Sequence, residues 1–282
     1  MDNIQRVYQH LLHADPDLAL IRLISTTNGK HAWIGPAGAY WRVFPFILNS
    51  HSFQTAPSLK HAYESAKAVG RFLKALEGLD PALLHHTIPD FHNSMKRWEQ
   101  MNQAIQKDTQ NRLKVVREEV DFIQKNADIF EKIQQAPLPI RVVHNDTKMD
   151  NILFDKRTEK VLGLIDWDTI MPGTLLSDYG DLVRTSVNPI PEHSDQLEKI
   201  ILDQELIKIL EQGFLYYAND LLTAEEKELI PLAPLWITLE QAMRFLTDFL
   251  MGDIYYKTDF EGHNLARVRN QIRLFEMLKK IK

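Results

Sequence analysis

The stretch of sequence that decides the fold runs from residue 143 to residue 168 and reads VHNDTKMDNILFDKRTEKVLGLIDWD. Its first part, residues 144–151, has the form H-x-D-x-x-x-x-N. Two apolar runs, residues 152–154 and 161–165, flank a polar loop and predict a β-hairpin. Such a hairpin returns the chain on itself, so Asp166 is expected to lie beside Asn151.

The oxygen-bearing side chains of this stretch suit phosphoryl transfer from ATP. That reaction needs a carboxylate to receive the proton of the attacking hydroxyl, and oxygen ligands for the Mg²⁺ that bridges the phosphates. We interpret Asp146 as the base or hydroxyl-positioning residue, and Asn151 and Asp166 as Mg²⁺ ligands. Alone, an H-x-D pair is more often a turn with local hydrogen bonds, and Asp166 could cap a helix. The two motifs together, with a hairpin between them, favour the catalytic interpretation.

Neighbouring polar residues are expected to support this loop. His144 is predicted to pack and hydrogen-bond rather than to act as the base. Lys148 either places a charge near the phosphates or is solvated. Asp168 is expected to hydrogen-bond locally, with assistance to the metal as the alternative. Asp178 and Asp181 are expected to cap the next helix or to hold the loop through backbone bonds.

The N-terminal fifth of the chain has β character. Apolar residues at helical spacing predict a short helix over residues 3–12. Strand-like runs rich in branched and aromatic residues follow, separated by turn residues, and predict a small antiparallel sheet from residues 18–25, 31–34 and 40–48. We therefore assign residues 1–50 to a small β lobe.

The remaining residues, 51–282, are assigned to a mainly helical lobe that contains the Asp146 loop and the hairpin. Helical periodicity predicts long helices over residues 57–78, 113–130, 197–222 and 265–278. Thr223 with Glu226 has the pattern of a capping box. The expected fold class is thus α+β, with two lobes of unequal size.

Composition excludes several classes of protein. The 282 residues carry 33 Lys and Arg against 38 Asp and Glu, a formal net charge of −5, so no basic field for nucleic acid or an anionic membrane is expected. The absence of Cys excludes disulfide scaffolds, iron–sulfur clusters, Cys-based zinc sites and thiol nucleophiles. His85, His86 and His263 have no partner at metal-ligand spacing and are expected at the surface. We expect a cytoplasmic monomer that binds a small molecule.

The motifs resemble those of a known family. The string H-N-D-x-x-x-x-N, the later I-D-W-D, Pro172-Gly173 and the S-D-Y-G-D-L run of residues 177–182 are similar to the aminoglycoside phosphotransferase and choline kinase group. These enzymes are relatives of protein kinases that phosphorylate hydroxyl groups of small molecules. The resemblance implies a protein-kinase-like fold, with ATP and Mg²⁺ as cofactors.

A narrower resemblance concerns the acceptor. The string RFLTDFLMGDIY at residues 244–255, together with W-R-V-F at residues 41–44, is similar to N-acetylhexosamine 1-kinases. That resemblance implies transfer to the anomeric hydroxyl of an N-acetylhexosamine, with Arg244 and Tyr255 as substrate contacts. The alternatives are that Arg244 forms a surface helix pair with Asp248 and that Tyr255 belongs to the core.

One part of the family pattern is missing. Such kinases begin with strands that carry a phosphate-covering loop and a basic residue, whereas the first glycine here is Gly29. The β lobe is therefore expected to be partial, through truncation of a longer chain or through real loss. On this alignment the segment from Phe44 to Ile47 would contact adenine, which makes Phe44 and Phe46 the expected nucleotide-binding residues.

Three alternative functions remain open. The acceptor could be another small alcohol, such as choline, homoserine or an aminoglycoside. The chain could be an inactive pseudokinase or binding fragment, because the phosphate-covering loop is missing. It could also be a metal-dependent hydrolase using the same carboxylates, since some relatives of the sugar kinases are labelled mucin desulfatases. A formylglycine sulfatase is disfavoured, because the chain has no Cys and no S-x-P-x-R string from which to form the nucleophile.

Overall fold

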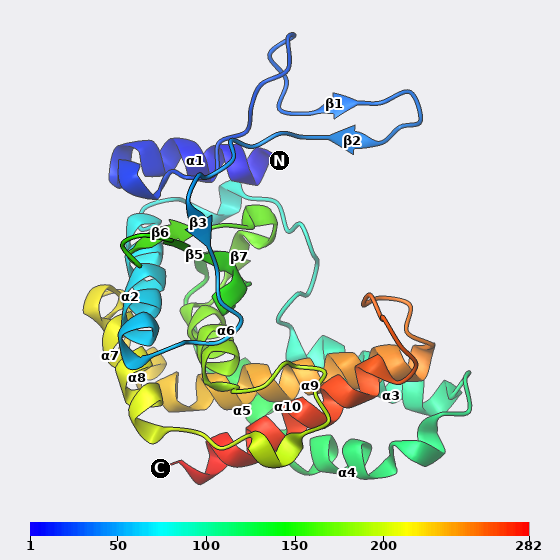
Figure 1. Cartoon of the computed structure of the whole chain (residues 1–282). Coiled ribbons are helices and arrows are strands. Elements are labelled where there is room, and N and C mark those ends of the chain that lie inside the picture. The colour runs from blue at the N-terminus through cyan, green and yellow to red at the C-terminus, as the bar shows by residue number, and fades with distance from the viewer. Residues whose placement is uncertain (282) are drawn as a thin grey trace.

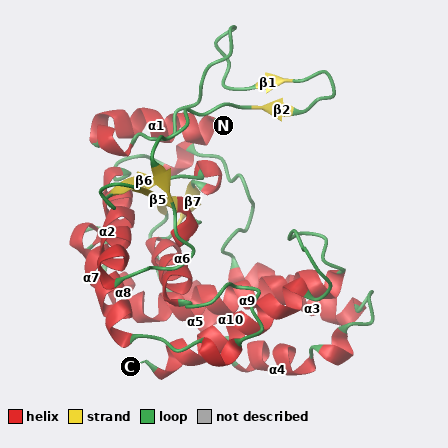
Figure 2. Cartoon of the chain, viewed as in Figure 1, coloured by secondary structure: helices red, strands yellow, loops and turns green. Residues whose placement is uncertain are grey.

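The computed structural model describes residues 1–281, which are mainly helical with small antiparallel sheets (Figures 1 and 2). The helices are α1 (Asp2–Ala14), α2 (Leu59–Ala75), α3 (Ser94–Lys107), α4 (Arg117–Lys125), α5 (Asp128–Gln135), α6 (Leu175–Val187), α7 (Gln204–Ala218), α8 (Ala224–Leu229), α9 (Ala233–Met251) and α10 (His263–Lys280). The strands are β1 (Trp33–Ile34), β2 (Tyr40–Trp41), β3 (Ser50–His51), β4 (Arg141–Val143), β5 (Ile152–Asp155), β6 (Val161–Leu164) and β7 (Met171–Gly173).

The N-terminal part is less regular than the sequence predicts. The hairpin of β1 and β2 forms and projects from the rest of the molecule (Figure 1). The expected strand at residues 18–25 is wrong: Ile21 and Leu23 are buried and Ile24 is exposed, as in a strand, but no ladder forms. A single backbone bond joins this run to the third one, from Ile24 N to Val43 O at 2.9 Å. The side chains of residues 21–24 therefore alternate between buried and exposed although their backbone does not pair in a sheet.

The predicted central hairpin is confirmed. Strand β5 pairs with β6, with Ile152 opposite Leu164, and β3 adds to the other side of β5. Strand β4 pairs with β7, with Val143 opposite Met171. Residues 144–151 leave β4 at the edge where residues 165–170 enter β7, so the two polar loops lie side by side.

Helix α9 is the centre of the helical part, and α3, α6 and α10 all pack against it (Figure 1). It is buried on most of its circumference, as expected for a helix rich in apolar residues on every face. Helix α6 approaches it closely because Gly180 has no side chain: a Cβ there would lie 2.5 Å from the carbonyl oxygen of Ala233. Helix α2 packs in the same way against α7.

Two long helices are shorter than predicted. The run at residues 113–130 is divided into α4 and α5, because the Asn126 side chain donates to the carbonyl of Phe122 at 2.9 Å and the helix ends there. The run at residues 197–222 becomes regular only at α7, which Asp203 caps. The capping box of Thr223 and Glu226 is confirmed. None of the helices within residues 1–281 has both the length and the apolarity needed to cross a membrane.

Candidate active site

The loop of residues 144–151, here named the Asp146 loop, is held at its start by helix α6. The buried carboxylate of Asp178 accepts hydrogen bonds from the backbone N–H groups of His144 at 2.8 Å and Asn145 at 2.7 Å. The Thr147 hydroxyl donates to the Asp178 carbonyl at 2.5 Å. These bonds hold Asn145 at a φ of 65°, a conformation that Asn adopts more readily than most residues. Asp178 therefore has the loop-holding role that the sequence predicts.

The Asp146 carboxylate lies at the centre of this loop, with 23% of its side chain exposed. The Asn151 side-chain amide donates to the main-chain oxygen of Asp146 at 2.8 Å and to its Oδ2 at 2.9 Å. Lys148 Nζ donates to the same Oδ2 at 3.0 Å. One carboxylate oxygen is thus oriented by two donors, and Oδ1 receives no hydrogen bond from residues 1–281. The structure brings Asp146 and Asn151 together as the spacing predicts.

The buried His144 ring joins the Asp146 loop to the loop after β6. Its Nε2 lies 2.9 Å from the Ile165 carbonyl oxygen, and its Nδ1 accepts from the backbone N–H of Asp146 at 3.3 Å. A ring that donates at Nε2 and accepts at Nδ1 is neutral. Burial lowers the pKa of His144, which favours the same form. His144 is therefore a structural link between the loops, in agreement with the sequence interpretation.

Asp166 follows β6 at the exposed side of the same junction, with a φ of 62°. The loops are joined there by a backbone bond from Ile165 N to Asn151 O at 2.9 Å. Desolvation by the surrounding chain, and next the charge of Asp146, raise the pKa of Asp166. The Asp146 charge next to Asp166 contributes to a local negative potential that a cation would relieve.

The donor set fits Mg²⁺ with few protein ligands. Residues 1–281 contain no group of three or more His, Cys, Asp or Glu side chains placed to hold a metal. Mg²⁺, however, is usually bound by one or two carboxylates and by substrate phosphates, with water completing the shell. Asn151 Oδ1 accepts no hydrogen bond within the described chain, and Asp166 offers a second oxygen ligand on the adjoining loop. An amide oxygen and a carboxylate are thus available together.

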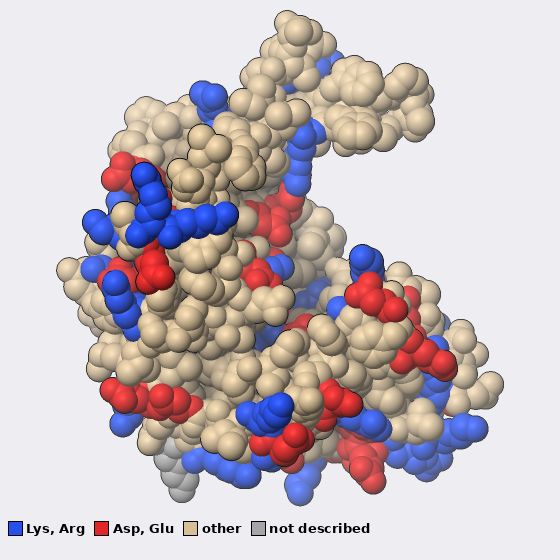
Figure 3. All heavy atoms as spheres, viewed as in Figure 1, with Lys and Arg blue, Asp and Glu red and all other residues tan. Residues whose placement is uncertain are grey.

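Asp168 is tied to a distant residue rather than bonded only locally, which corrects the expectation from the sequence. Both of its carboxylate oxygens accept from the Arg42 guanidinium. Hydrogen bonding to Arg42 lowers the pKa of Asp168, so this carboxylate stays ionised. The segment after β2 is thereby attached to the loop that carries Asp166. Figure 3 shows acidic side chains in the hollow between the projecting hairpin and the helical end of the molecule.

The two aromatic residues expected to contact the nucleotide differ in their surroundings. Phe44 is half-buried against the hydrophobic core, and the Arg42 guanidinium lies 5.1 Å from its ring centroid. Phe46 is 83% exposed. The two rings therefore differ in how much of their surface is accessible to a nucleotide.

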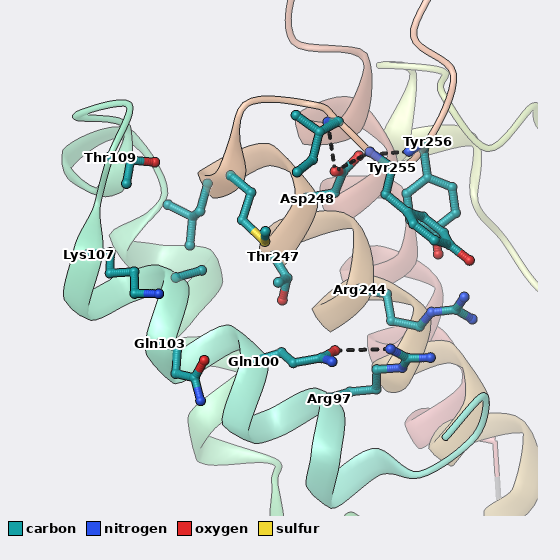
Figure 4. Close-up of a pocket in the computed structure, with 14 residues that line it drawn as sticks. Arg97, Gln100, Gln103, Lys107, Thr109, Arg244, Thr247, Asp248, Tyr255 and Tyr256 are labelled. Carbon is teal, nitrogen blue, oxygen red and sulfur yellow. Dashed lines mark hydrogen bonds between the residues drawn. The ribbon is translucent and has the colours of Figure 1, made fainter. Parts of the chain in front are cut away.

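Arg244 and Tyr255 line one pocket of about 540 Å³ between α3, α9 and the loop that follows α9 (Figure 4). Sequence reasoning missed the contribution of α3, which adds Arg97, Gln100 and Lys107. Figure 4 shows Arg97 and Arg244 extending side by side. Asp146 does not line this pocket. The structure therefore groups the expected substrate residues together, in a pocket that the residues of the Asp146 loop do not line.

Neither alternative interpretation of Arg244 and Tyr255 holds. Arg244 forms no ion pair with Asp248 among the described residues; its guanidinium lies 4.8 Å from the Phe91 ring centroid. Tyr255 is 63% exposed and so does not belong to the core.

Asp248 instead shapes the loop that presents Tyr255. Its Oδ1 accepts the backbone N–H groups of Ile254 at 2.9 Å and Tyr255 at 2.8 Å. Its Oδ2 accepts from Tyr256 N at 3.0 Å and from the Asn264 side chain at 2.8 Å. The sequence does not predict this role of Asp248, because the N–H groups that it binds lie in an irregular loop with no periodic pattern.

His263 also differs from expectation. His85 and His86 are exposed, but His263 is only 3% exposed and stacks on Phe260 with a centroid distance of 4.4 Å. Its Nδ1 accepts from the backbone N–H of Asp259 at 3.1 Å. His263 is the first residue of helix α10, which the sequence predicts from about residue 265. Helical periodicity does not show which side of this helix the preceding loop covers.

Comparison with known proteins identifies the family. A model described as the phosphotransferase enzyme family matches residues 1–204. The chain belongs to this family. The protein is accordingly a phosphotransferase enzyme, as the motif of residues 144–151 predicts. The family also agrees with the expected kinship to aminoglycoside phosphotransferases.

Solved structures show the same fold at low sequence identity. An aminoglycoside phosphotransferase from Alicyclobacillus acidocaldarius is 15% identical with a TM-score of 0.61, over 99% of this chain and 82% of that one. A choline/ethanolamine kinase family protein from Mesorhizobium loti is 13% identical with a TM-score of 0.59, over 99% and 79%. An ethanolamine kinase from Plasmodium vivax is 12% identical with a TM-score of 0.58, over 98% and 74%. The phosphotransferase therefore has the fold of aminoglycoside phosphotransferases and choline kinases.

Proposed function

We propose that this phosphotransferase is a kinase that transfers the γ-phosphate of ATP, with Mg²⁺, to a hydroxyl of a neutral sugar, the anomeric hydroxyl of an N-acetylhexosamine. The observation that carries the proposal is the oriented Asp146 carboxylate, with Asn151 and Lys148 on one oxygen and the other oxygen free. We also propose that residues 1–50 and 51–282 act as two lobes, with the nucleotide bound between them beside Phe44 and Phe46.

In this mechanism the chain mainly positions the reactants. Asp146 Oδ1 is free to accept a hydrogen bond from the acceptor hydroxyl. It would take the hydroxyl proton as the bond from the hydroxyl oxygen to the γ-phosphorus forms and the bond from that phosphorus to the leaving ADP oxygen breaks. Lys148 lies next to that carboxylate, where its charge offsets negative charge that accumulates during transfer. Asn151 Oδ1 and Asp166 would hold Mg²⁺, which supplies charge neutralisation at the phosphates.

The charge of the pocket disfavours a cationic acceptor. Arg97, Lys107 and Arg244 line it, and neither arginine has a carboxylate partner within residues 1–281. The pocket's acidic residue, Asp248, already accepts N–H groups from its own loop. Burial, and next the charge of Arg244, lower the pKa of Arg97, as expected where two guanidinium groups lie close together. An ammonium-bearing acceptor such as choline or an aminoglycoside would meet repulsion there.

Guanidinium groups and tyrosine suit a sugar in another respect. Arginine offers several donors to hydroxyl and acetamide carbonyl oxygens, and the Tyr255 ring offers an apolar face together with a hydroxyl. Gln100 and Thr247 add neutral polar groups to the same pocket. This combination supports the resemblance to N-acetylhexosamine kinases noted in the sequence.

Initial rates with a panel of acceptors test the proposal. N-acetylglucosamine and N-acetylgalactosamine are expected to be phosphorylated, and choline, ethanolamine and kanamycin are expected to give no turnover. Arg244→Ala and Tyr255→Ala should raise KM for the sugar, whereas Tyr216→Ala, an exposed tyrosine on α7, should not. Turnover of a cationic acceptor in place of the sugars would contradict the assignment of the acceptor.

A further inference from the structure

A largely covered histidine, His92, and a buried glutamate, Glu240, form a pair between the Asp146 loop and helix α9, which contributes Arg244 to the pocket of Figure 4. His92 Nδ1 lies 2.8 Å from Glu240 Oε1, and the two side chains are 13% and 1% exposed. His92 Nε2 lies 3.2 Å from the main-chain oxygen of Asn145. Neither residue has a role in the mechanism described above.

The geometry requires a charged imidazolium. A carboxylate and a backbone carbonyl are both hydrogen-bond acceptors, and a neutral imidazole has only one N–H to offer them. Only the doubly protonated ring can donate to Glu240 and Asn145 at once. The charge of Glu240 raises the pKa of His92 against the opposing effect of burial, which agrees with this geometry.

The second oxygen of Glu240 is also satisfied. Ser94 donates its hydroxyl hydrogen to Glu240 Oε2, and Ser94 Oγ accepts from Trp236 Nε1 at 2.6 Å. A buried charged pair whose members are all hydrogen-bonded holds its surroundings in a defined arrangement. The pair is thus a rigid connection rather than a loose contact.

The location of this connection gives it a consequence for function. Asn145 precedes Asp146, and α6 holds its N–H, whereas His92 holds its carbonyl. On the other side, Glu240 lies one turn before Arg244 on α9. Phe91, the neighbour of His92, lies beneath the Arg244 guanidinium. His92 and Glu240 therefore join the peptide next to Asp146 to the wall of the pocket.

We propose that His92 and Glu240 are positioning residues that set the Asp146 carboxylate relative to the bound acceptor. This inference rests on the proposed role of Asp146 in phosphoryl transfer. Loss of the bond to the Asn145 carbonyl would let the peptide before Asp146 rotate. Acceptor and ATP would still bind, but the attacking hydroxyl would no longer be aligned.

The kinetic test uses His92→Leu, Glu240→Gln and the control His86→Leu, an exposed histidine six residues before His92. His92→Leu is expected to lower kcat about 10- to 100-fold, the loss typical of a small misalignment, with KM for ATP unchanged. Glu240→Gln keeps an acceptor for Ser94 but lowers the pKa of His92. At acidic pH the kcat of Glu240→Gln should therefore equal that of wild type. As the pH is raised, its kcat should begin to fall at a lower pH than the kcat of wild type does. The control should behave as wild type.

The pH profile distinguishes positioning from general stability. The charged groups facing His92 are Glu240 and Arg244 from α9 and Asp178 from α6. Removing Glu240 changes the alkaline limb of kcat only if His92 must be protonated for transfer. The decrease of kcat at alkaline pH should be absent in His92→Leu. If His92 had only a structural role, this decrease would remain in the variant. Equal profiles in wild type and Glu240→Gln would overturn the proposal.

An NMR titration tests the inference without turnover. In protein with ¹³C-labelled histidine, the His92 ring should remain protonated above the ordinary histidine pKa of about 6.5. The amide signals of residues 144–147 should shift with the same midpoint, and His86→Leu should leave both unchanged. A neutral His92 ring, or a loop that does not sense its titration, would refute the positioning role. Absence of transfer to every acceptor would instead refute the proposed function.

Discussion

At the scale of single residues, the proposed transfer depends on one oxygen of Asp146 being oriented by donors while the other is free. Asp146→Asn keeps the bonds within the loop but removes the proton acceptor. We expect kcat to fall about 10²- to 10⁴-fold, the usual contribution of a general base, with the KM for ATP little changed. Asp150→Asn, an exposed carboxylate in the same loop, is the matched control and should retain activity. A fully active Asp146→Asn variant would exclude this role.

Asn151 and Asp166 are expected to set the requirement for Mg²⁺. Asp166→Asn removes a charged ligand, and Asn151→Ala removes both an amide ligand and the bond that orients Asp146. The Mg²⁺ concentration for half-maximal rate should rise about 10- to 100-fold in each variant. Asn151→Ala should in addition lower kcat at saturating Mg²⁺, because Asp146 loses a donor. Unchanged Mg²⁺ dependence in both variants would show that the metal is bound elsewhere.

At the scale of elements, helix α6 holds the Asp146 loop through a carboxylate that titrates near neutrality. Burial raises the pKa of Asp178 to about 7, although the His144 and Asn145 N–H groups act in the opposite direction. Between the unfolded and folded pKa values the native state binds the extra proton, so this group's contribution to stability falls as pH rises towards about 7.

Asp178→Asn tests this linkage. Asn offers one acceptor to two N–H donors, so the variant should lose about 1–3 kcal/mol of unfolding free energy. The difference from wild type should be larger at about pH 5 than at about pH 8, because only the wild type loses stability over that range. Urea unfolding at both pH values measures it. A difference that widens with pH would show that the pKa of Asp178 is not raised.

The loop after α9 depends similarly on Asp248. Asp248→Asn places an amide N–H group against backbone N–H donors, so the loop that carries Tyr255 should lose its shape. We expect KM for the acceptor to rise roughly 10-fold and kcat to change less. Asp259→Asn, an exposed residue of the same loop, should have no such effect. If both variants have the KM of wild type, this loop does not contact the acceptor.

The elements were predictable where local signals and tertiary contacts agreed. The hairpin of β5 and β6, the capping box at Thr223 and helix α2 followed from period, turn residues and caps. The strand expected at residues 18–25 is not formed. Its alternating side chains are buried and exposed as in a strand, but its backbone does not pair in a ladder. The grouping of Asp146 with Asn151 followed from spacing on one loop. The contributions of Arg97, His92 and Asp248 could not be predicted, since each depends on how α3, α9 and their loops pack.

At the scale of the whole molecule, two regions with different chemistry are connected through His92 and Glu240. The Asp146 loop and the residues after β6 bring carboxylates together, whereas Arg97 and Arg244 line the pocket of α3 and α9. Helix α9 and the segment before α3 connect them through His92. The Arg42–Asp168 pair attaches the N-terminal part to the same junction.

Phosphorus-31 NMR of the protein with ATP, Mg²⁺ and N-acetylglucosamine or N-acetylgalactosamine is the most direct test of the proposed sugar kinase activity. We predict a new resonance from a sugar 1-phosphate that grows in step with ADP, and no such resonance with Asp146→Asn. Release of inorganic phosphate without a sugar phosphate would indicate a hydrolase and would contradict the account. So would persistent ATP with both sugars together with turnover of choline, ethanolamine or an aminoglycoside.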